Sequence, residues 1–262
     1  MSLSVAIVAM DEEANIGRTL ASVSWADEIV LVDSGSKDRT CKIAREQGAR
    51  VINEPWRGYV AQKQYAIELC TKDWVLLLDA DEEVSPGLAE EIRAAITDPH
   101  AVNGYRLPRK NLFLGRWMRH GGFHPDPKLR LFRRSQGFVT GHDPHDRCEL
   151  KPPVSGEAPQ QTRQFKNALI HYTYPNLTLY LAHMNRYSSL GAQLAIAKGH
   201  RSFSFNDIVV RPMATFVYNY FFRLGFLDGR EGLLLHLYHA GYVSWKYAKA
   251  WELERNKSRQ VD

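Results

Sequence analysis

Apolar runs and helix-like spacing alternate along the first hundred residues. The apolar runs predict strands at Ser4–Ala9, Glu28–Val32, Arg50–Asn53 and Trp74–Leu78. Segments with one apolar side predict the helices Glu13–Val23, Thr40–Gln47 and Tyr59–Cys70, and a fourth helix that Ser85 and Pro86 open as N-cap and first-turn proline. This alternation is typical of an α/β fold with a doubly wound parallel sheet.

Polar clusters follow three of these strands directly, at Met10–Glu13, Asp33–Asp38 and Asp79–Glu83. In open α/β sheets, ligands bind in the crevice beyond the carboxyl ends of the strands. We therefore expect the three clusters to meet in one ligand site.

The pattern changes after residue 100. Residues 101–175 are rich in Gly, Pro, His and Arg, and short strands at Gly104–Pro108, Leu129–Arg133 and Asn167–Tyr172 predict an antiparallel completion of the same sheet with long loops. Residues 176–255 have helical spacing, with aromatic and basic side chains mixed. We predict one domain over 1–175 and a helical region over 176–262.

Composition narrows the class of protein. Of the 262 residues, 44% are hydrophobic and 24% charged, which excludes a disordered tail, a collagen-like rod and a disulfide scaffold. The three cysteines lack any metal or redox spacing, and we expect a reducing, cytoplasmic compartment. The opening MSLSVAIVAMDEE lacks the basic start of a signal peptide, and no apolar run has the length of about 20 residues that a membrane span needs.

Charge is divided unevenly along the chain. Residues 1–100 carry 10 Lys and Arg against 18 Asp and Glu, whereas residues 101–182 carry 13 against 5. Cation binding would explain the acidic part, and phosphates, acidic lipid or acidic sugar could face the basic part. Chance and solvation are the alternative.

Asp79 and Asp81 follow a buried strand in extended spacing, so both side chains point to one side. Two carboxylates roughly 6 Å apart repel by about 3 kcal/mol at an effective dielectric near 20. Either one carboxylate takes up a proton or a cation lies between them. Mg²⁺ or Mn²⁺ suits these oxygen ligands and would in turn hold a diphosphate. The alternative is a solvated strand end.

Asp33 and Glu12 stand at the ends of the second and first strands. In a nucleotide crevice, a carboxylate accepts hydrogen bonds from a base imide or from ribose hydroxyls. Asp33 could instead cap the following helix, as Ser36 or Asp38 could. The sequence has no Gly-x-Gly-x-x-Gly turn at a helix start and no Gly-Lys-Ser/Thr loop, which disfavours dinucleotide and ATP-loop proteins.

Together, these segments resemble a known family. SVAIVAMDEEANIGRTLASV, DEIVLVDSGSKDRT and WVLLLDADEEV are similar to glycosyltransferase family 2, which implies the A-type glycosyltransferase fold, a Rossmann-like doubly wound mixed sheet, here with a C-terminal helical extension. QKQYAIELCTKDWVLLLDADEE, RLFRR, NRYSSLGAQLAIAKG and RPMATFVYNYFFRLGFLDGREG resemble the bacterial subgroup that includes lipopolysaccharide-core β-1,4-glucosyltransferases. The similarity covers nearly the whole chain.

The resemblance implies roles for individual residues. It places Glu12 and Asp33 at the nucleoside, Lys63 on the donor side, and Asp79 and Asp81 at the metal and diphosphate. The positions implied to surround the nucleotide sugar are Ala9, Glu12, Asp33, Lys63, Asp79, Ala80 and Asp81. The family usually has an aromatic residue where Met10 stands, so base stacking is weaker here or comes from elsewhere.

The same resemblance implies a catalytic base at Asp146, where the subgroup usually has Glu, with His145 orienting the base or touching the donor. An inverting transfer needs a carboxylate that takes the proton of the acceptor hydroxyl. Alternatively, His142 and His145 belong to a structural hydrogen-bond network. A zinc site from His142, His145 and His171 would lack motif spacing.

Two basic regions have open interpretations. Strand alternation puts Arg130 and Arg134 on one face and Arg133 on the other, to meet either phosphate or solvent. Pro212–Phe226 is aromatic and flanked by arginines, and is too short and polar to span a bilayer. It could lie in a membrane interface, or pack as a helical pair or oligomer contact.

The predicted function is an inverting, metal-dependent hexosyltransferase. The resemblance implies a UDP-sugar donor, most simply UDP-glucose, a lipid-linked saccharide acceptor such as lipopolysaccharide core, and a peripheral place on the inner face of the cytoplasmic membrane, with an anionic membrane surface and no nucleic acid as partner. One alternative is a haloacid-dehalogenase-like phosphatase, because LLLDADEEV also resembles that signature, with Asp79 as nucleophile. Others are a non-catalytic membrane-surface protein and a nucleotidyltransferase.

Overall fold

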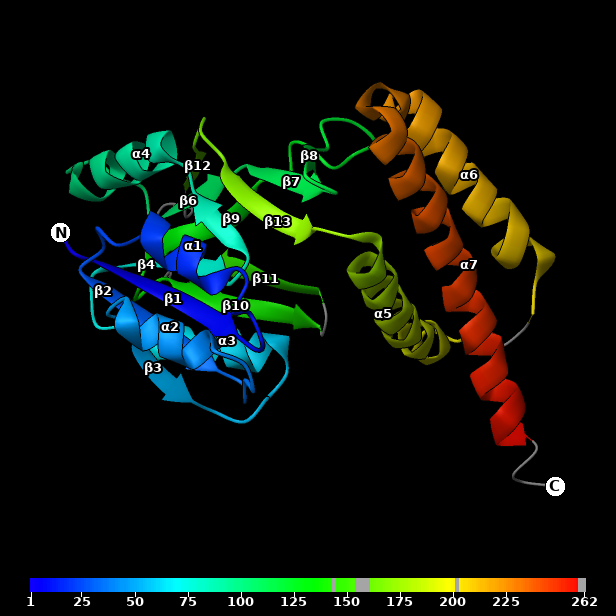
Figure 1. Cartoon of the computed structure of the whole chain (residues 1–262), viewed down its shortest axis with the longest axis horizontal. Coiled ribbons are helices and arrows are strands. Elements are labelled where there is room, and N and C mark those ends of the chain that lie inside the picture. The colour runs from blue at the N-terminus through cyan, green and yellow to red at the C-terminus, as the bar shows by residue number, and fades with distance from the viewer. Residues whose placement is uncertain (143–144, 154–160, 201–202, 259–262) are drawn as a thin grey trace. The chain divides into compact units, whose positions relative to one another are not determined.

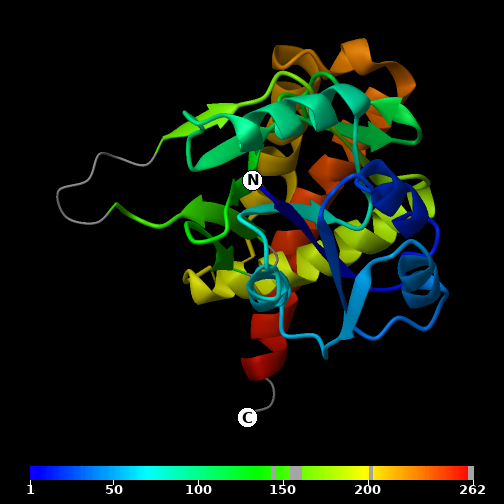
Figure 2. The same cartoon turned by 90° about the vertical axis from the view of Figure 1, so that its left-hand side faces the viewer.

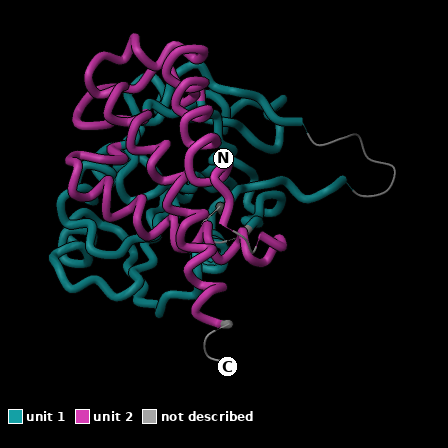
Figure 3. Tube along the Cα trace, turned by 90° about the vertical axis from the view of Figure 1, so that its right-hand side faces the viewer, with its two compact units in different colours: residues 1–110, 126–171 teal, residues 111–125, 172–262 magenta. Residues whose placement is uncertain are grey.

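The computed structural model describes residues 1–142, 145–153, 161–200 and 203–258. The chain divides into two compact units (Figure 3). Unit 1 holds residues 1–110 and 126–171, and unit 2 holds residues 111–125 and 172–262. The units thus separate at residue 171, and residues 111–125 belong with the helical part of the chain.

A seven-stranded sheet in the order β12-β6-β9-β4-β1-β2-β3 forms the centre of unit 1. Its parallel half, β3-β2-β1-β4, consists of the four predicted strands, and β9 then pairs antiparallel with both β4 and β6. The predicted mixed sheet is confirmed (Figure 1). The strands are β1 (Leu3–Ala9), β2 (Glu28–Asp33), β3 (Arg50–Asn53), β4 (Trp74–Asp79), β6 (Gly104–Leu107), β9 (Lys128–Arg133) and β12 (Thr162–Gln164).

Both faces of this sheet are covered (Figure 2). One face packs against α1 (Ile16–Ser22), α2 (Thr40–Glu46) and α4 (Pro86–Thr97). The other packs against α3 (Tyr59–Glu68) and a two-stranded ribbon of β10 (Gly137–His142) and β11 (His145–Leu150). A strand buried on both faces is apolar at every position, and all five residues of 74–78 are fully buried.

Helix α1 begins three residues later than the apolar spacing predicts. The backbone N–H of Glu12 donates to Thr40 Oγ1 at 2.7 Å, and that of Glu13 donates to Asp38 Oδ2 at 2.9 Å. These contacts hold the segment after β1 against the start of α2. Residues 11–13 are therefore a loop at the strand ends and not a first helical turn.

A second sheet has the order β5-β13-β7-β8. Its members are β5 (Glu82–Val84), β7 (Arg109–Phe113), β8 (Arg116–Trp117) and β13 (Leu169–Tyr174). The predicted strand Asn167–Tyr172 overlaps β13, so it belongs to this second sheet, and its predicted place in the first sheet is wrong. The apolar pattern does not predict the other three strands, because they are short and polar. The pairing of β5 with β13 sets Glu82 opposite His171 in register.

Unit 2 is helical, as predicted for residues 176–255. Its core gathers Phe113, Met118, Tyr180, Met184 and Leu235. Within the described ranges, none of the helices is both long and apolar enough to cross a membrane. The elements are α5 (Leu177–Ala197), the π-helical turns η1 (Asn206–Val210) and η2 (Tyr218–Phe222), α6 (Arg211–Val217), the 3₁₀ turn η3 (Gly225–Asp228) and α7 (Gly229–Ser258).

Two glycines and a buried acid fix the turn before α7. A Cβ on Gly232 would lie 2.3 Å from the carbonyl oxygen of Gly225, so no other residue fits there without moving the backbone. Asp228, only 2% exposed, accepts a 2.8 Å hydrogen bond from the backbone N–H of His120 and lies 2.9 Å from His120 Nδ1. The GFLDGREG stretch is thus a structural turn of unit 2.

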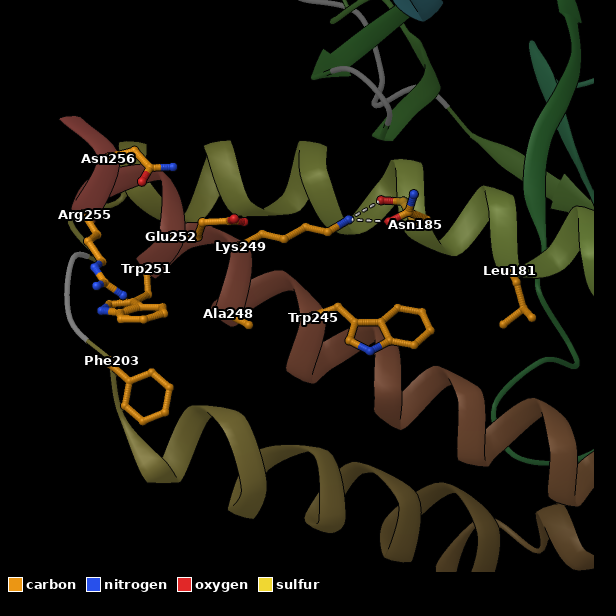
Figure 4. Close-up of a pocket in the computed structure, with 10 residues that line it drawn as sticks. All are labelled: Leu181, Asn185, Phe203, Trp245, Ala248, Lys249, Trp251, Glu252, Arg255 and Asn256. Carbon is orange, nitrogen blue, oxygen red and sulfur yellow. Dashed lines mark hydrogen bonds between the residues drawn. The ribbon is translucent and has the colours of Figure 1, made fainter. Parts of the chain in front are cut away.

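An open pocket of about 880 Å³ also lies in unit 2, between α5, α7 and the segment before η1 (Figure 4). Trp245, Trp251 and Phe203 line it. Lys249 Nζ lies 2.7 Å from Asn185 Oδ1, so this ammonium is paired within the unit. The predicted site residues do not line this pocket, because they belong to unit 1.

Candidate active site

The carboxyl ends of β1, β2 and β4 bring the three polar clusters together. Ala9 and Asp33 are register partners on neighbouring strands, and the backbone N–H of Ser34 donates to the Ala9 carbonyl. Asp11 Oδ1 accepts from the backbone N–H of Lys37 at 2.7 Å. The carbonyl of Ala80, which is 5% exposed, accepts from a threonine hydroxyl of α1. The expected meeting of the clusters is therefore present.

Asp33 is buried, with 2% of its surface exposed. Its Oδ2 accepts hydrogen bonds from the backbone N–H groups of Gly35 and Ser36, each at 2.9 Å. Burial and the neighbouring Asp33 carboxylate raise the pKa of the Cys41 thiol to about 11. Asp33 thus organises its own loop, and does not cap α2, whose N-cap residue is Arg39 without a side-chain cap.

Glu12 lies in a region of negative charge. Burial raises the pKa of its carboxyl, and the charges of Asp81, Asp38 and Asp79 raise it further, against a hydrogen bond from Asn15 that lowers it. A carboxyl whose pKa responds to three other carboxylates faces an excess of negative charge. The electrostatics at this point of the site therefore favour a cation.

Asp79 is held between two cations of the protein. Its Oδ1 lies 2.8 Å from Lys63 Nζ, and its Oδ2 lies 2.6 Å from a guanidinium nitrogen of Arg130. Burial alone would raise the pKa of Asp79, yet Arg130 and Lys63 hold it well below its usual range. Asp79 is therefore a half-buried, ionised and fully paired carboxylate.

Lys63 also contacts the predicted base. Its Nζ lies 2.9 Å from Oδ2 of Asp146, so one ammonium of α3 bridges Asp79 on β4 and Asp146 on β11. Burial would lower the pKa of Lys63, but Asp79 and Asp146 raise it. Three residues that are far apart in the sequence thus meet at one ammonium group. The side chains of His145 and His142 lie outside the described residues.

The ion pairs continue as a chain of alternating sign. Arg130 contacts Glu82 at 3.2 Å, Glu82 lies 3.5 Å from Arg109, and Arg109 pairs with Asp126. Glu82 is fully buried, and its second oxygen accepts from the backbone N–H of Asp79 at 2.9 Å. We call this series the charge chain. It comprises Asp146, Lys63, Asp79, Arg130, Glu82, Arg109, Asp126 and Lys128.

The charge chain decides between the alternatives for the arginines of β9. Arg130 is 5% exposed and contacts two carboxylates, so its guanidinium is engaged within the protein and is not solvated. Arg134 follows the end of β9, is exposed and donates to the backbone carbonyl of Lys72. The sequence contains no signal for the partners of Arg130, because Asp79 on β4 and Glu82 on β5 reach it only through the pairing of strands that are far apart in the chain.

Asp81 faces a histidine from β13. Its Oδ2 lies 3.4 Å from Nε2 of His171. Burial would lower the pKa of this imidazole, but the Asp81 carboxylate raises it. Because His171 is partnered with Asp81, it is a site residue, although the sequence indicated it only as a member of a zinc site.

A divalent cation is compatible with these residues. Among the residues that the structure describes, no three His, Cys, Asp or Glu side chains are grouped closely enough to hold a metal by themselves. Mg²⁺ usually takes one or two protein carboxylates and completes its shell with water and substrate phosphates. Asp81, beside His171 and within the field of Glu12, fits that donor set.

Comparisons with known proteins agree with the site. The model of glycosyl transferase family 2 matches residues 4–150. The lipopolysaccharide core biosynthesis glycosyltransferase LpsC of Rhizobium meliloti is 28% identical over 99% of this chain and 95% of its own length. An uncharacterized glycosyltransferase of Rickettsia typhi is 31% identical over 99% of this chain and 89% of its own.

Solved structures show a more distant similarity. Glucosyl-3-phosphoglycerate synthase from Mycobacterium tuberculosis, in complex with Mn²⁺, UDP and glucosyl-3-phosphoglycerate, is 20% identical with a TM-score of 0.40, over 53% of this chain and 61% of its own. A similarity of that size carries no argument about chemistry. The family model, in contrast, covers more than half of the chain, including Glu12, Asp33, Lys63, Asp79 and Asp146. The chain therefore belongs to glycosyl transferase family 2 and is a glycosyltransferase.

Proposed function

We propose that this glycosyltransferase is inverting and metal-dependent, and that it moves glucose from UDP-glucose to a lipid-anchored saccharide such as lipopolysaccharide core. The bridge that Lys63 makes between Asp79 and Asp146 supports the proposal most directly. It brings Asp79, a residue of the diphosphate motif, and Asp146, the proposed base, to one ammonium group.

In the proposed reaction, the acceptor hydroxyl attacks the anomeric carbon of the sugar from the side opposite the nucleotide. Asp146 accepts the hydroxyl proton as the new carbon–oxygen bond forms, and the bond to the diphosphate breaks. UDP leaves with the bonding electrons. Lys63 positions Asp146 through their 2.9 Å contact, and His145 orients the base or touches the donor.

The donor end uses residues of the strand ends. Glu12 and Asp33 hold the nucleoside, with Ala9 and Ala80 beside them. Asp81 and Asp79 are the proposed ligands of Mg²⁺ or Mn²⁺, with His171 next to Asp81. When bound, the metal offsets the negative charge that develops on the departing diphosphate. Asp79 shares its oxygens with Lys63 and Arg130, so Asp81 carries most of this role.

The acceptor class rests on the full-length similarity to LpsC, which is named for lipopolysaccharide core biosynthesis. The UDP-sugar rests on the family resemblance of the strand-end residues. A lipid-anchored acceptor places the protein at the inner face of the cytoplasmic membrane as a peripheral protein. The helical unit is the proposed membrane-associating region, and the catalytic domain is the part before it.

The phosphatase and scaffold alternatives have less support. A phosphatase would need Asp79 as a nucleophile, yet both of its oxygens are paired with cations. A non-catalytic protein would not bind nucleotide. Calorimetric titration of UDP with Mn²⁺ separates binding from its absence, and release of UDP rather than phosphate or pyrophosphate identifies the transferase.

The decisive experiment is a screen of nucleotide sugars for UDP release, with Asp81→Ala and the neighbouring control Glu83→Ala. Glu83 pairs with Arg18 at 3.7 Å and is not assigned to the metal. Asp81→Ala should abolish release while the protein remains folded, and Glu83→Ala should retain it. EDTA should also abolish release in the unmodified protein. Full activity of Asp81→Ala or undiminished activity in EDTA contradicts the mechanism.

A further inference from the structure

Unit 2 exposes an unusual number of large apolar side chains on one helical hairpin. Met213 is 63% exposed, Phe221 53% and Phe222 74%. Soluble proteins seldom expose contiguous apolar surface of this kind unless it binds something. We call this surface the apolar face and define it by Met213, Val217, Phe221, Phe222, Phe226 and Leu227.

The apolar face is built into a packed helix. Met213, Val217 and Phe221 recur every fourth residue, and each is exposed. Pro212, one residue before Met213, is buried within the unit. The helical run α6–η2 lies beside α7 (Figure 1). Its outer side is therefore apolar although its inner side is already covered.

The segment 208–227 carries charge of one sign, and Glu231, at the start of α7, is paired with Arg116 at 3.5 Å. Between Asp207 and Asp228 the sequence contains no acidic residue, and both of these aspartates are buried, at 4% and 2% exposure. Arg223 and Arg230 are exposed beside the apolar face, and the guanidinium of Arg223 lies 5.4 Å from the ring centre of Tyr218. The exposed surface thus combines aromatic rings with cations.

We propose that the apolar face docks on the surface of an anionic phospholipid bilayer. The proposal rests on the proposed function, because a lipid-anchored acceptor is presented at such a surface. The rings enter the boundary between headgroups and acyl chains, and Arg223 and Arg230 pair with lipid phosphates. Basic residues near an anionic leaflet each contribute to binding.

The same charges disfavour a second copy of the chain as the partner. In a two-fold dimer the same patch lies on both sides of the interface. Such an interface would bring both copies of Arg223 and Arg230 into one patch, where Asp207 and Asp228 are buried and Glu231 is paired with Arg116. An anionic membrane supplies the missing negative charge, whereas a second apolar face does not.

The test is flotation of the full chain with phosphatidylcholine vesicles, with or without phosphatidylglycerol. We expect binding to the anionic vesicles at low salt, and at least a tenfold weaker partition coefficient for Phe221→Ser/Phe222→Ser. The matched control, Leu179→Ser/Leu253→Ser, also removes two exposed apolar side chains of unit 2, away from the apolar face, and should bind like the unmodified chain. Arg223→Gln/Arg230→Gln should lose about fivefold for each charge.

Several results would overturn the proposal: absence of binding to anionic vesicles at low salt, equal losses in the phenylalanine and leucine variants, or a dimer in sedimentation that Phe221→Ser/Phe222→Ser dissolves. UDP release is measured in the same preparations without lipid. If flotation fails while UDP release persists, the docking surface is wrong and the transferase proposal stands. If UDP release fails while flotation succeeds, the transferase proposal is wrong and the docking surface stands.

Discussion

Replacing Arg130 by methionine removes a guanidinium that contacts two carboxylates inside unit 1. Arg130 is 5% exposed, and its nitrogen lies 2.6 Å from Asp79 and 3.2 Å from Glu82. Methionine is apolar and flexible enough to fill much of the space. The change therefore tests charge more than volume.

The expected cost follows from the partners that remain. Removing one member of a buried ion pair costs about 3–5 kcal/mol, because the other charge is left uncompensated. Asp79 keeps Lys63 at 2.8 Å, and Glu82 keeps Arg109 at 3.5 Å. We therefore expect a loss near the lower end, about 3 kcal/mol of unfolding free energy.

Urea unfolding at neutral pH measures this loss, with Arg134→Met as the control, because Arg134 follows the same strand in the chain and is exposed. The control should stay within about 0.5 kcal/mol of the unmodified protein. Adding Glu82→Gln to Arg130→Met also removes the charge of the carboxylate that has lost Arg130 and keeps only Arg109. The double variant should then be more stable than the sum of the single losses predicts, by about 0.5–3 kcal/mol.

The result that refutes this reasoning is an Arg130→Met variant as stable as Arg134→Met. Strict additivity of Arg130→Met and Glu82→Gln would also contradict it, since residues in one ion-pair network couple. Either outcome would mean that the charge chain contributes no net stability to the site.

Other changes test the base, a buried histidine and the cation separately. Asp146→Asn keeps the shape of the proposed base without its proton affinity, so kcat should fall by about 10²–10⁴-fold. UDP binding, measured by calorimetry, should be retained. An unchanged kcat would rule out Asp146 as the base. Burial lowers the pKa of His236 to about 4. Between about pH 6.5 and pH 4, this histidine is therefore protonated in the unfolded chain and neutral in the folded chain. Stability should therefore be full above pH 6.5 and fall by up to about 3 kcal/mol as the pH drops toward 4, and His236→Leu should remove that dependence in urea unfolding; parallel pH profiles would contradict it. Mn²⁺ with UDP at about 100 times the dissociation constant should stabilise the protein by about 2.7 kcal/mol in thermal unfolding, and Asp81→Asn should abolish this stabilisation. Equal stabilisation of both proteins would show that Asp81 is not a ligand of the metal.

The parallel half of the fold was predictable because each element carries its own local signal. The range Arg50–Asn53 matches β3 at both ends, and the apolar run from Trp74 matches β4. The start of α1 was not predictable, since it depends on hydrogen bonds from Glu12 and Glu13 to side chains of a later segment. Apolar spacing contains no information about such distant partners.

The meeting of the strand-end clusters was predictable, but the contacts of their side chains were not. Asp33, Asp79 and their neighbours lie close together for any conformation of the loops, because the carboxyl ends of parallel strands lie at the same edge of the sheet. The partners of Asp81 and Arg130 come from strands that pair through the tertiary fold. The sequence indicated His171 only as a member of a zinc site, and its contact with Asp81 depends on the pairing of β13 with β5.

The tight turn between Gly225 and Gly232 has a consequence for redesign. The close approach of Gly232 to the Gly225 carbonyl and the hydrogen bond to the buried Asp228 set its shape, and neither contact involves the exposed ring of Phe222. Outward side chains such as Phe222 can therefore be exchanged without changing the backbone of the turn. Substitutions there should retune which surface the enzyme adheres to, and leave the hairpin itself unaltered.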